Sequence, residues 1–175
     1  ILFTDAGKAM RFAETEVRDT GRSAYGVRGI RLSDGQKVIA LIVIGEGTIL
    51  TVTENGFGKR TPAADYPRHS RGGQGVIAIQ TSERNGQVIG AVQVENDHEI
   101  MLISDGGTLV RTRVDEVSVI GRNAQGVKLI SLQGEEKLAG VEKIEGMGEL
   151  ESNGDETEEE NGSALDEGEN GEGVE

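Results

Sequence analysis

The residues best suited to chemistry in this 175-residue chain are arginines that recur at fixed distances from glycines. They form two sets, one standing four residues after a first repeated glycine and the other four residues before a second: Arg11, Arg60 and Arg111, then Arg22, Arg71 and Arg122. A guanidinium is permanently charged and offers a planar fork of N–H donors that suits phosphate. Cations at regular intervals predict a ligand with evenly spaced negative charges, and duplex nucleic acid has that property.

Neighbouring basic residues enlarge several of these positions into clusters: Lys59, Arg68 and Arg113. In the second set, the glycines of Arg71-Gly72-Gly73 let backbone amides approach a phosphate closely, which favours a phosphate contact. The first set has two explanations that stay open, phosphate contact or an ion pair, because an acid also repeats in register: Glu16, Asp65 and Glu116. We predict DNA contacts from both arginine sets and from the three neighbours.

The elements that position these arginines belong to an internal repeat of about 50 residues. Within each copy a second glycine, followed by valine, stands 19 residues after the first: Gly7 to Gly26, Gly56 to Gly75, and Gly107 to Gly126. These offsets predict three blade-like units at residues 1–48, 49–99 and 100–146, followed by a tail at 147–175.

Each unit is predicted to hold four short strands. The first pair turns at Ala6-Gly7, Asn55-Gly56 or Gly106-Gly107, and the second at Asp34-Gly35, Asn85-Gly86 or Gly134-Glu135; Asn-Gly and Asp-Gly favour hairpins. Runs such as 38–44 are apolar on both faces of a strand, which indicates sheets stacked face to face and hence a propeller. A helix over residues 8–18 is disfavoured, because the second copy carries Pro62 and Pro67.

Composition excludes several kinds of chemistry. Without cysteine there are no disulfides and no cysteine-based zinc or iron–sulfur sites, and His69 and His98 are too far apart for a familiar metal site. The segment 56–61 resembles a phosphate loop only superficially, because Thr53 stands where the first glycine is required. We therefore expect no catalytic site, metal or cofactor in this chain.

The net charge of −13 conceals two regions. Residues 147–175 contain twelve acids and no lysine or arginine, which leaves 18 basic and 19 acidic residues in a nearly neutral body. The tail is predicted to be disordered, either competing with DNA for the basic rim or serving only solubility. No apolar run approaches a membrane span, so a soluble intracellular protein is expected, and an opening at Ile1 in mid-strand indicates a piece of a longer one.

Several segments resemble the C-terminal region of the bacterial DNA gyrase A subunit. They run from Ile49 to Thr61, from Glu83 to Gly86, from Gly90 to Val94, from Gly107 to Arg113 and from Gly121 to Val127. The resemblance covers essentially all of residues 1–146, and the acidic tail is similar to those of Gram-negative gyrases.

The resemblance implies an all-β fold, a β-pinwheel in which neighbouring blades exchange an outer strand, with three blades present here. It also implies a basic rim that wraps duplex DNA, so that the holoenzyme introduces negative supercoils with ATP. The implied partners are the gyrase B subunit, together with a second A subunit, in an A₂B₂ assembly in the bacterial cytoplasm, at the nucleoid. The implied ATP, Mg²⁺ and catalytic tyrosine lie outside this chain, and residues 70–75 are only a degenerate relative of the family's first-blade box.

Two other functions remain open from the sequence. The C-terminal domain of topoisomerase IV has the same architecture, usually with fewer blades and without comparable wrapping. A propeller that serves as a protein-interaction scaffold would also suit the nearly neutral body, although the arginines in register argue against it. A scaffold would show no salt-dependent affinity for DNA.

Overall fold

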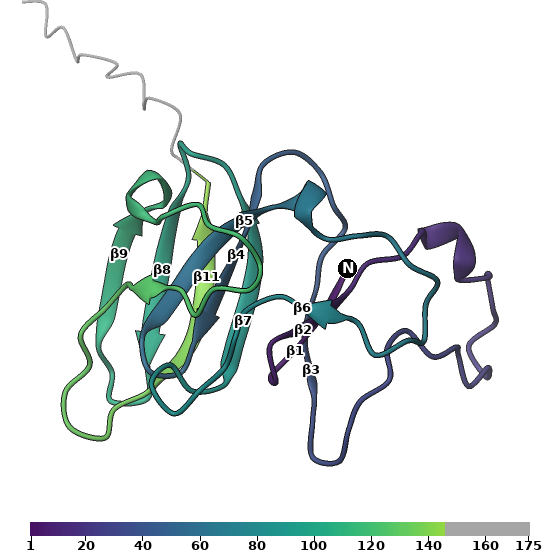
Figure 1. Ribbon diagram of the computed structural model, residues 1–175, viewed down its shortest axis with the longest axis horizontal. Coiled ribbons are helices and arrows are strands. Elements are labelled where there is room, and N and C mark those ends of the chain that lie inside the picture. Colours follow the sequence, from purple (N-terminus) through teal and green to yellow (C-terminus); the bar gives the residue numbers. More distant parts are fainter. Residues whose placement is uncertain (146–175) are drawn as a thin grey trace, which may run out of the picture.

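The computed structural model describes residues 1–145, which form three antiparallel sheets lying side by side in chain order (Figure 1). The first sheet has the strand order β3 (Val38–Leu41), β1 (Leu2–Thr4), β2 (Lys8–Met10) and β6 (Val76–Ile77). The middle sheet has the order β10 (Val127–Lys128), β5 (Phe57–Pro62), β4 (Thr48–Thr53) and β7 (Val88–Val94). The third has the order β11 (Leu138–Ile144), β8 (Glu99–Ser104) and β9 (Leu109–Arg113).

The first predicted turn of each repeat forms the hairpin expected of it. Gly7, Gly56 and Gly107 have φ of 73°, 82° and 87°, a conformation that glycine adopts without strain. Each donates its N–H to the carbonyl three residues earlier, as Gly56 does to Thr53 at 3.1 Å. These turns join β1 to β2, β4 to β5, and β8 to β9.

The second predicted hairpin of each repeat is wrong. Gly86 has a positive φ of 73°, so the turn is present, but β6 before it belongs to the first sheet and β7 after it to the middle sheet. Strand β6 pairs with β2, placing Val76 opposite Ala9, and β10 pairs with β5, placing Val127 opposite Gly58. The outer strand of a repeat therefore completes the sheet of the repeat before it, as the family resemblance implied.

The second glycine of the repeat makes this exchange possible. A Cβ atom on Gly75 would lie 2.4 Å from the carbonyl oxygen of Ala9, and one on Gly126 would lie 2.7 Å from that of Gly58. Both glycines also have positive φ, 72° and 85°. Only glycine allows the incoming chain to approach the neighbouring strand this closely.

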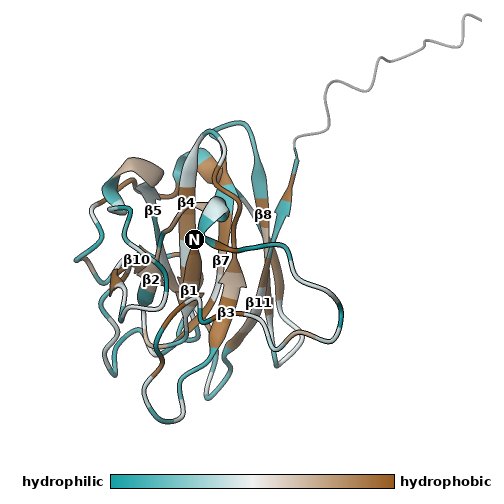
Figure 2. Cartoon of the chain, turned by 90° about the vertical axis from the view of Figure 1, so that its right-hand side faces the viewer, coloured by the Kyte–Doolittle hydropathy of each residue, from teal (hydrophilic) through white to brown (hydrophobic). Residues whose placement is uncertain are grey.

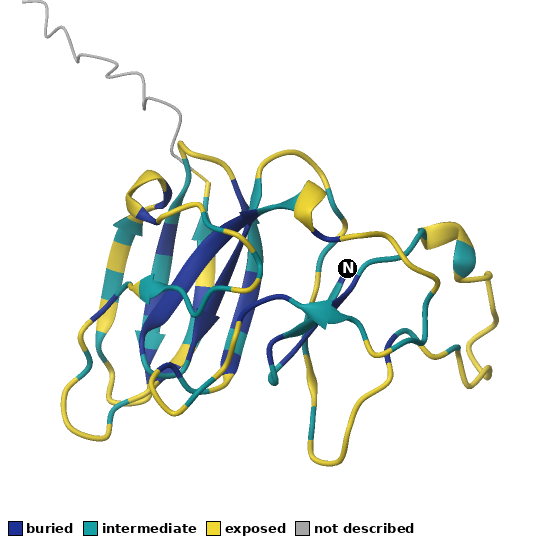
Figure 3. Cartoon of the chain, viewed as in Figure 1, coloured by how far each residue is buried: buried dark blue, intermediate teal, exposed yellow. Residues whose placement is uncertain are grey.

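The core consists of two apolar layers between stacked sheets. One layer joins the first and middle sheets and includes Phe3, Ile49 and Tyr66, and the other joins the middle and third sheets and includes Leu50 and Leu102. Successive β4 residues thus serve opposite layers, and the middle sheet is the most deeply buried (Figure 3). Hydrophobic residues are concentrated in the strands, while the loops are mostly hydrophilic (Figure 2).

The long connection after each inner hairpin contains a short 3-10 turn where a helix was disfavoured. These turns are η1 (Glu14–Glu16), η2 (Ala63–Asp65) and η3 (Val114–Glu116). No helical segment in residues 1–145 is long and apolar enough to cross a membrane. The predicted disordered tail at 147–175 lies outside the described residues.

Candidate nucleic-acid interface

Two arginines of the first set reach forward to the following repeat. Arg11 donates from Nη1 to the carbonyl oxygens of Ala63 and Tyr66, at 2.9 and 3.1 Å. Arg60 donates from Nε to the carbonyl of Val117 at 2.8 Å. Tyr66 and Val117 both directly follow a 3-10 turn, so the two contacts are equivalent. We call this contact the forward clamp.

Two arginines of the second set reach back to the preceding repeat. Arg122 donates from Nη1 to the carbonyl of Ile77 at 2.7 Å, and Arg71 donates from Nη1 to that of Arg28 at 3.1 Å. Ile77 and Arg28 each stand two residues after the second glycine of their repeat. We call this contact the backward clamp. Arg71 and Arg122 are half-buried, and each guanidinium has N–H groups beyond those it gives to carbonyls.

Among residues 1–145, the first arginine set forms no ion pair with the repeated acids, which was one of the two explanations left open for it. Arg11 and Arg60 bind backbone carbonyls, and Glu16 instead accepts the backbone N–H of Arg71 at 3.1 Å. Carbonyls satisfy these arginines because the residue that follows each 3-10 turn brings its carbonyl to the junction between repeats.

Lys59 and Arg60 lie in the interior, which argues against the predicted DNA contacts from these two. Arg60 is 5% exposed, and its Nη1 donates to Asn96 Oδ1 at 2.6 Å. Lys59 is 0% exposed, and its ammonium donates to Thr61 Oγ1 and to the carbonyls of Ala78, Gly121 and Arg122. Burial, assisted by the nearby charge of Arg122, lowers the pKa of Lys59 to about 8.

Arg111 and Arg113 are exposed and paired with acids. Arg111 forms an ion pair with Glu99 on the neighbouring strand β8, and Arg113 forms one with Asp115 at 2.5 Å. Exposed pairs of this kind contribute little to stability and remain accessible to a stronger anion.

The most accessible cations lie on the loops and outer strands. Of the predicted residues, Arg22 and Arg68 are exposed in addition to the ion-paired Arg111 and Arg113. Sequence reasoning missed Arg28 and Lys128, two exposed residues that stand two positions after the second glycine. Lys128 lies on β10, one of the two edge strands of the middle sheet. Their shared distance from the second glycine could have identified this pair. The equivalent residue of the second repeat is the uncharged Ile77, so the pattern is not continuous.

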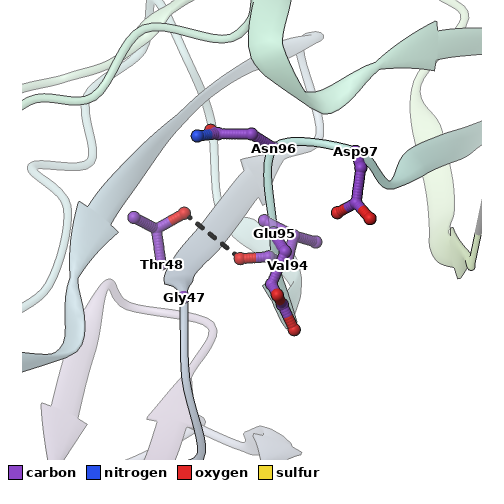
Figure 4. Close-up of a pocket in the computed structure, with 6 residues that line it drawn as sticks. All are labelled: Gly47, Thr48, Val94, Glu95, Asn96 and Asp97. Carbon is purple, nitrogen blue, oxygen red and sulfur yellow. Dashed lines mark hydrogen bonds between the residues drawn. The ribbon is translucent and has the colours of Figure 1, made fainter.

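At least one hollow of the surface is unsuited to an anion. One hollow of about 430 Å³ is lined by Gly47, Thr48 and residues 94–97, and Glu95 and Asp97 bring carboxylates to it (Figure 4). Two acids make this hollow unfavourable for phosphate. In the described part of the chain, no group of three or more His, Cys, Asp or Glu residues is placed to hold a metal.

Stacked antiparallel sheets that exchange outer strands, with arginines at every junction between repeats, define a repeat domain of the propeller class. A family model described as "DNA gyrase C-terminal domain, beta-propeller" matches residues 1–44, 47–95 and 98–145. The chain therefore belongs to the family of DNA gyrase C-terminal domains.

Individual relatives agree with this family. The DNA gyrase A subunit of Pseudomonas aeruginosa is 61% identical over 142 residues, and that of Escherichia coli is 55% identical. The matches cover 81% of this chain but only 15% and 16% of those relatives, so the chain spans about one sixth of their length.

Solved structures share the fold. A DNA gyrase A C-terminal domain matches with a TM-score of 0.76 and 30% identity over 82% of this chain and 49% of that one. A topoisomerase IV C-terminal domain also reaches a TM-score of 0.76, over 82% of this chain and 46% of that one, but at 24% identity it shows the fold alone. The topoisomerase IV alternative is therefore less well supported.

Proposed function

We propose that this domain binds duplex DNA through its phosphates and holds it in a bend, as the wrapping part of a gyrase A subunit. The observation that carries the proposal is the repeated loop arginine: Arg71 and Arg122 are anchored through part of the guanidinium and retain further N–H groups. An anchored guanidinium loses less conformational entropy when it binds a phosphate. The exposed Arg22 is the equivalent residue of the first repeat.

The arrangement suits a ligand that is read by its charge and not by its bases. Bending a short DNA segment sharply costs on the order of several kcal/mol, because the persistence length is about 150 base pairs. Phosphate contacts repeated at regular intervals can offset this cost at any sequence. Arginines repeated at successive junctions between sheets provide such an interval.

The DNA contacts that we propose are those of the loops and outer strands. They come from Arg22, Arg68, Arg71 and Arg122, with Arg28 and Lys128 added. Arg11, Arg60 and Lys59 instead hold consecutive repeats together, and Arg111 and Arg113 contribute only where DNA displaces their acid partners.

The role of the whole protein is part of the same proposal. In an A₂B₂ gyrase at the bacterial nucleoid, DNA held in a bend by this domain would present a crossing segment for strand passage. ATP and Mg²⁺ would act in other parts of that assembly. The result would be the introduction of negative supercoils.

The test compares cations of the proposed interface with a cation elsewhere on the domain, in the full-length gyrase A protein. Arg22→Ala combined with Lys128→Ala should weaken DNA binding equally for unrelated sequences. The slope of log K against log salt should become shallower by about 0.9 for each lost phosphate contact. Fluorescence anisotropy across a salt series measures both quantities.

Lys143→Ala is the matched control, because Lys143 lies on β11, at the edge of the third sheet away from β9, and pairs with Glu145 at 2.9 Å. It should leave affinity and slope unchanged. An unchanged slope in the double variant would contradict the proposed contacts. Absence of any salt-dependent DNA affinity in the unaltered protein would favour the protein-interaction scaffold.

A further inference from the structure

The buried ammonium of Lys59 lies beneath the loop that carries Arg122. Its Nζ donates to the carbonyls of Gly121 and Arg122 at 2.9 and 3.1 Å. It also donates to Thr61 Oγ1 at 3.0 Å and to the carbonyl of Ala78 at 2.8 Å. One side chain thus joins strand β5, the exit of the exchanged strand β6 and the loop of the third repeat.

Other donors hold the same loop from below. Thr61 Oγ1 donates to the carbonyl of Ile120 at 2.8 Å, and the N–H of Gln80 donates to that of Ala124 at 3.1 Å. Asn85, itself 0% exposed, donates from Nδ2 to the carbonyl of Gln125 at 3.0 Å. Five of the six carbonyls in residues 120–125 therefore accept bonds from the second repeat. These hydrogen bonds point the carbonyl oxygens toward the second repeat. Their partial negative charges therefore face away from a ligand on the opposite side of the loop.

The first repeat shows that the position does not need a lysine to fold. Met10 occupies the place of Lys59, three residues after the first glycine, and is 2% exposed. A Cβ atom on Gly73 would lie 2.9 Å from the end of the Met10 side chain, so Met10 supports the equivalent loop by contact alone. Lys59 supplies directional bonds where Met10 supplies only volume.

Burying a cation beside another cation costs free energy, and hydrogen bonds to the cation must offset that cost. Here the ammonium binds both carbonyls that flank the Cα of Arg122, and the Arg122 guanidinium binds Ile77. Backbone and side chain of Arg122 are thus fixed from two directions. Such fixation is what a pre-formed phosphate contact requires.

We propose that Lys59 is a positioning residue, which holds the 120–125 loop so that Arg122 is ready to bind a DNA phosphate. This role rests on the proposed function, because it gives Arg122 a phosphate to bind. Lys59 itself never touches the DNA.

The test is Lys59→Met in the full-length gyrase A protein, which reproduces the side chain of the first repeat. Backbone amides of residues 121–126 should exchange hydrogen at least about tenfold faster, while those of residues 72–75 should not change. DNA affinity should fall by the same factor as in Arg122→Ala. The variant that combines both changes should bind DNA no more weakly than Arg122→Ala alone, because the two substitutions remove one contact.

Met10→Leu is the matched control and should leave exchange at residues 121–126 unchanged. Thr61→Val keeps the side-chain volume but removes both the bond to Ile120 and one acceptor of Lys59, so it should raise exchange in the same loop to a smaller extent. It provides the measurement if Lys59→Met does not fold.

Unchanged exchange in the loop would overturn the inference, as would additive losses of affinity in the combined variant. If Arg122→Ala alone leaves affinity and salt slope unchanged, the DNA contact assigned to this loop is wrong, and the inference fails with it. If Arg122→Ala weakens binding and Lys59→Met does not, the proposed function stands and only the role of Lys59 is overturned.

Discussion

At the scale of the residue, four of the repeated arginines donate hydrogen bonds to backbone carbonyls of a neighbouring repeat. The forward clamp of Arg11 and Arg60 and the backward clamp of Arg71 and Arg122 both cross a junction between repeats. A hydrogen bond from a charged donor contributes about 1.5–3 kcal/mol, and loss of its partner leaves a polar group unpaired. Repetition of arginine is therefore explained partly by architecture, before any ligand is considered.

Arg60→Met should destabilise the domain, because it leaves the Val117 carbonyl and the Asn96 amide without their partner. We expect the free energy of unfolding to fall by about 2–4 kcal/mol. Calorimetry of the domain's unfolding transition in the full-length protein measures the effect. Arg113→Met, at an exposed ion pair, should change it by less than about 1 kcal/mol; equal losses in the two variants would contradict the clamp.

Lys59 should make stability depend on pH. Its pKa is about 8 in the folded protein and 10.5 in the unfolded chain, so between these values the unfolded chain binds more protons and stability rises with pH. Burial raises the pKa of Tyr66 from 10 to about 12, which opposes the rise above pH 10. Asp65 and Arg122 are the other charged groups that act on Lys59.

The useful window is therefore about pH 8 to 10, where the Lys59 contribution should rise by about 2 kcal/mol. Chemical denaturation at intervals across this window gives the slope. Lys59→Met should lose the rise. A slope that is the same in both proteins would mean that Lys59 titrates as an ordinary surface lysine.

At the scale of the element, the exchanged outer strand depends on one glycine per junction. Gly126 combines positive φ with a close approach to Gly58, whereas Gly107 has positive φ and open space around it. Gly121 has open space and no such φ. Substitutions at these three glycines therefore distinguish the cost of backbone strain from the cost of steric contact.

Gly126→Ala should therefore destabilise most, by about 2–3 kcal/mol, Gly107→Ala by about 1 kcal/mol, and Gly121→Ala by less than about 0.5 kcal/mol. Thermal unfolding of the three variants gives the order. Only Gly126→Ala should also speed hydrogen exchange in β5 and β10, because it disturbs their pairing. The opposite order would place the strain of the junction elsewhere.

At the scale of the whole molecule, the repeats stack in one direction, so the outermost sheets differ from the middle one. Among the described residues, β9 has a partner on one side alone, and Leu109 at its start is 60% exposed. On strand β3 of the first sheet Leu41 is 69% exposed, and Val43, just after that strand, is 79% exposed. An unpaired strand edge and bare apolar side chains favour association.

A purified piece consisting of residues 1–175 should therefore associate as its concentration rises. Sedimentation velocity over a roughly tenfold range of concentration tests this, with the full-length protein run in parallel. Leu41→Lys combined with Leu109→Lys should reduce the association, because charge protects an exposed strand edge. A compact monomer at every concentration would contradict the prediction.

Much of the fold could be predicted because its signals are local. The turn at Asn55-Gly56 needs a residue that tolerates positive φ, and glycine meets this need through its own backbone. The spacing of the repeats can likewise be read directly from the sequence. The strand exchange, in contrast, was predicted from the family resemblance. The Asn85-Gly86 turn was also located correctly, but its hairpin was wrong, because pairing across a turn depends on competing partners elsewhere in the chain.

The candidate site was less predictable for the same reason. The sequence by itself determined that arginines recur in register and that each has a fixed place relative to the turns. Only the tertiary structure decided that Arg60 and Lys59 lie inside, that Arg71 and Arg122 share their guanidinium between protein and solvent, and that Lys128 lies on an outer edge. Spacing along a chain is a local property, whereas the environment of a charge depends on which distant backbone carbonyls the fold brings within hydrogen-bonding reach.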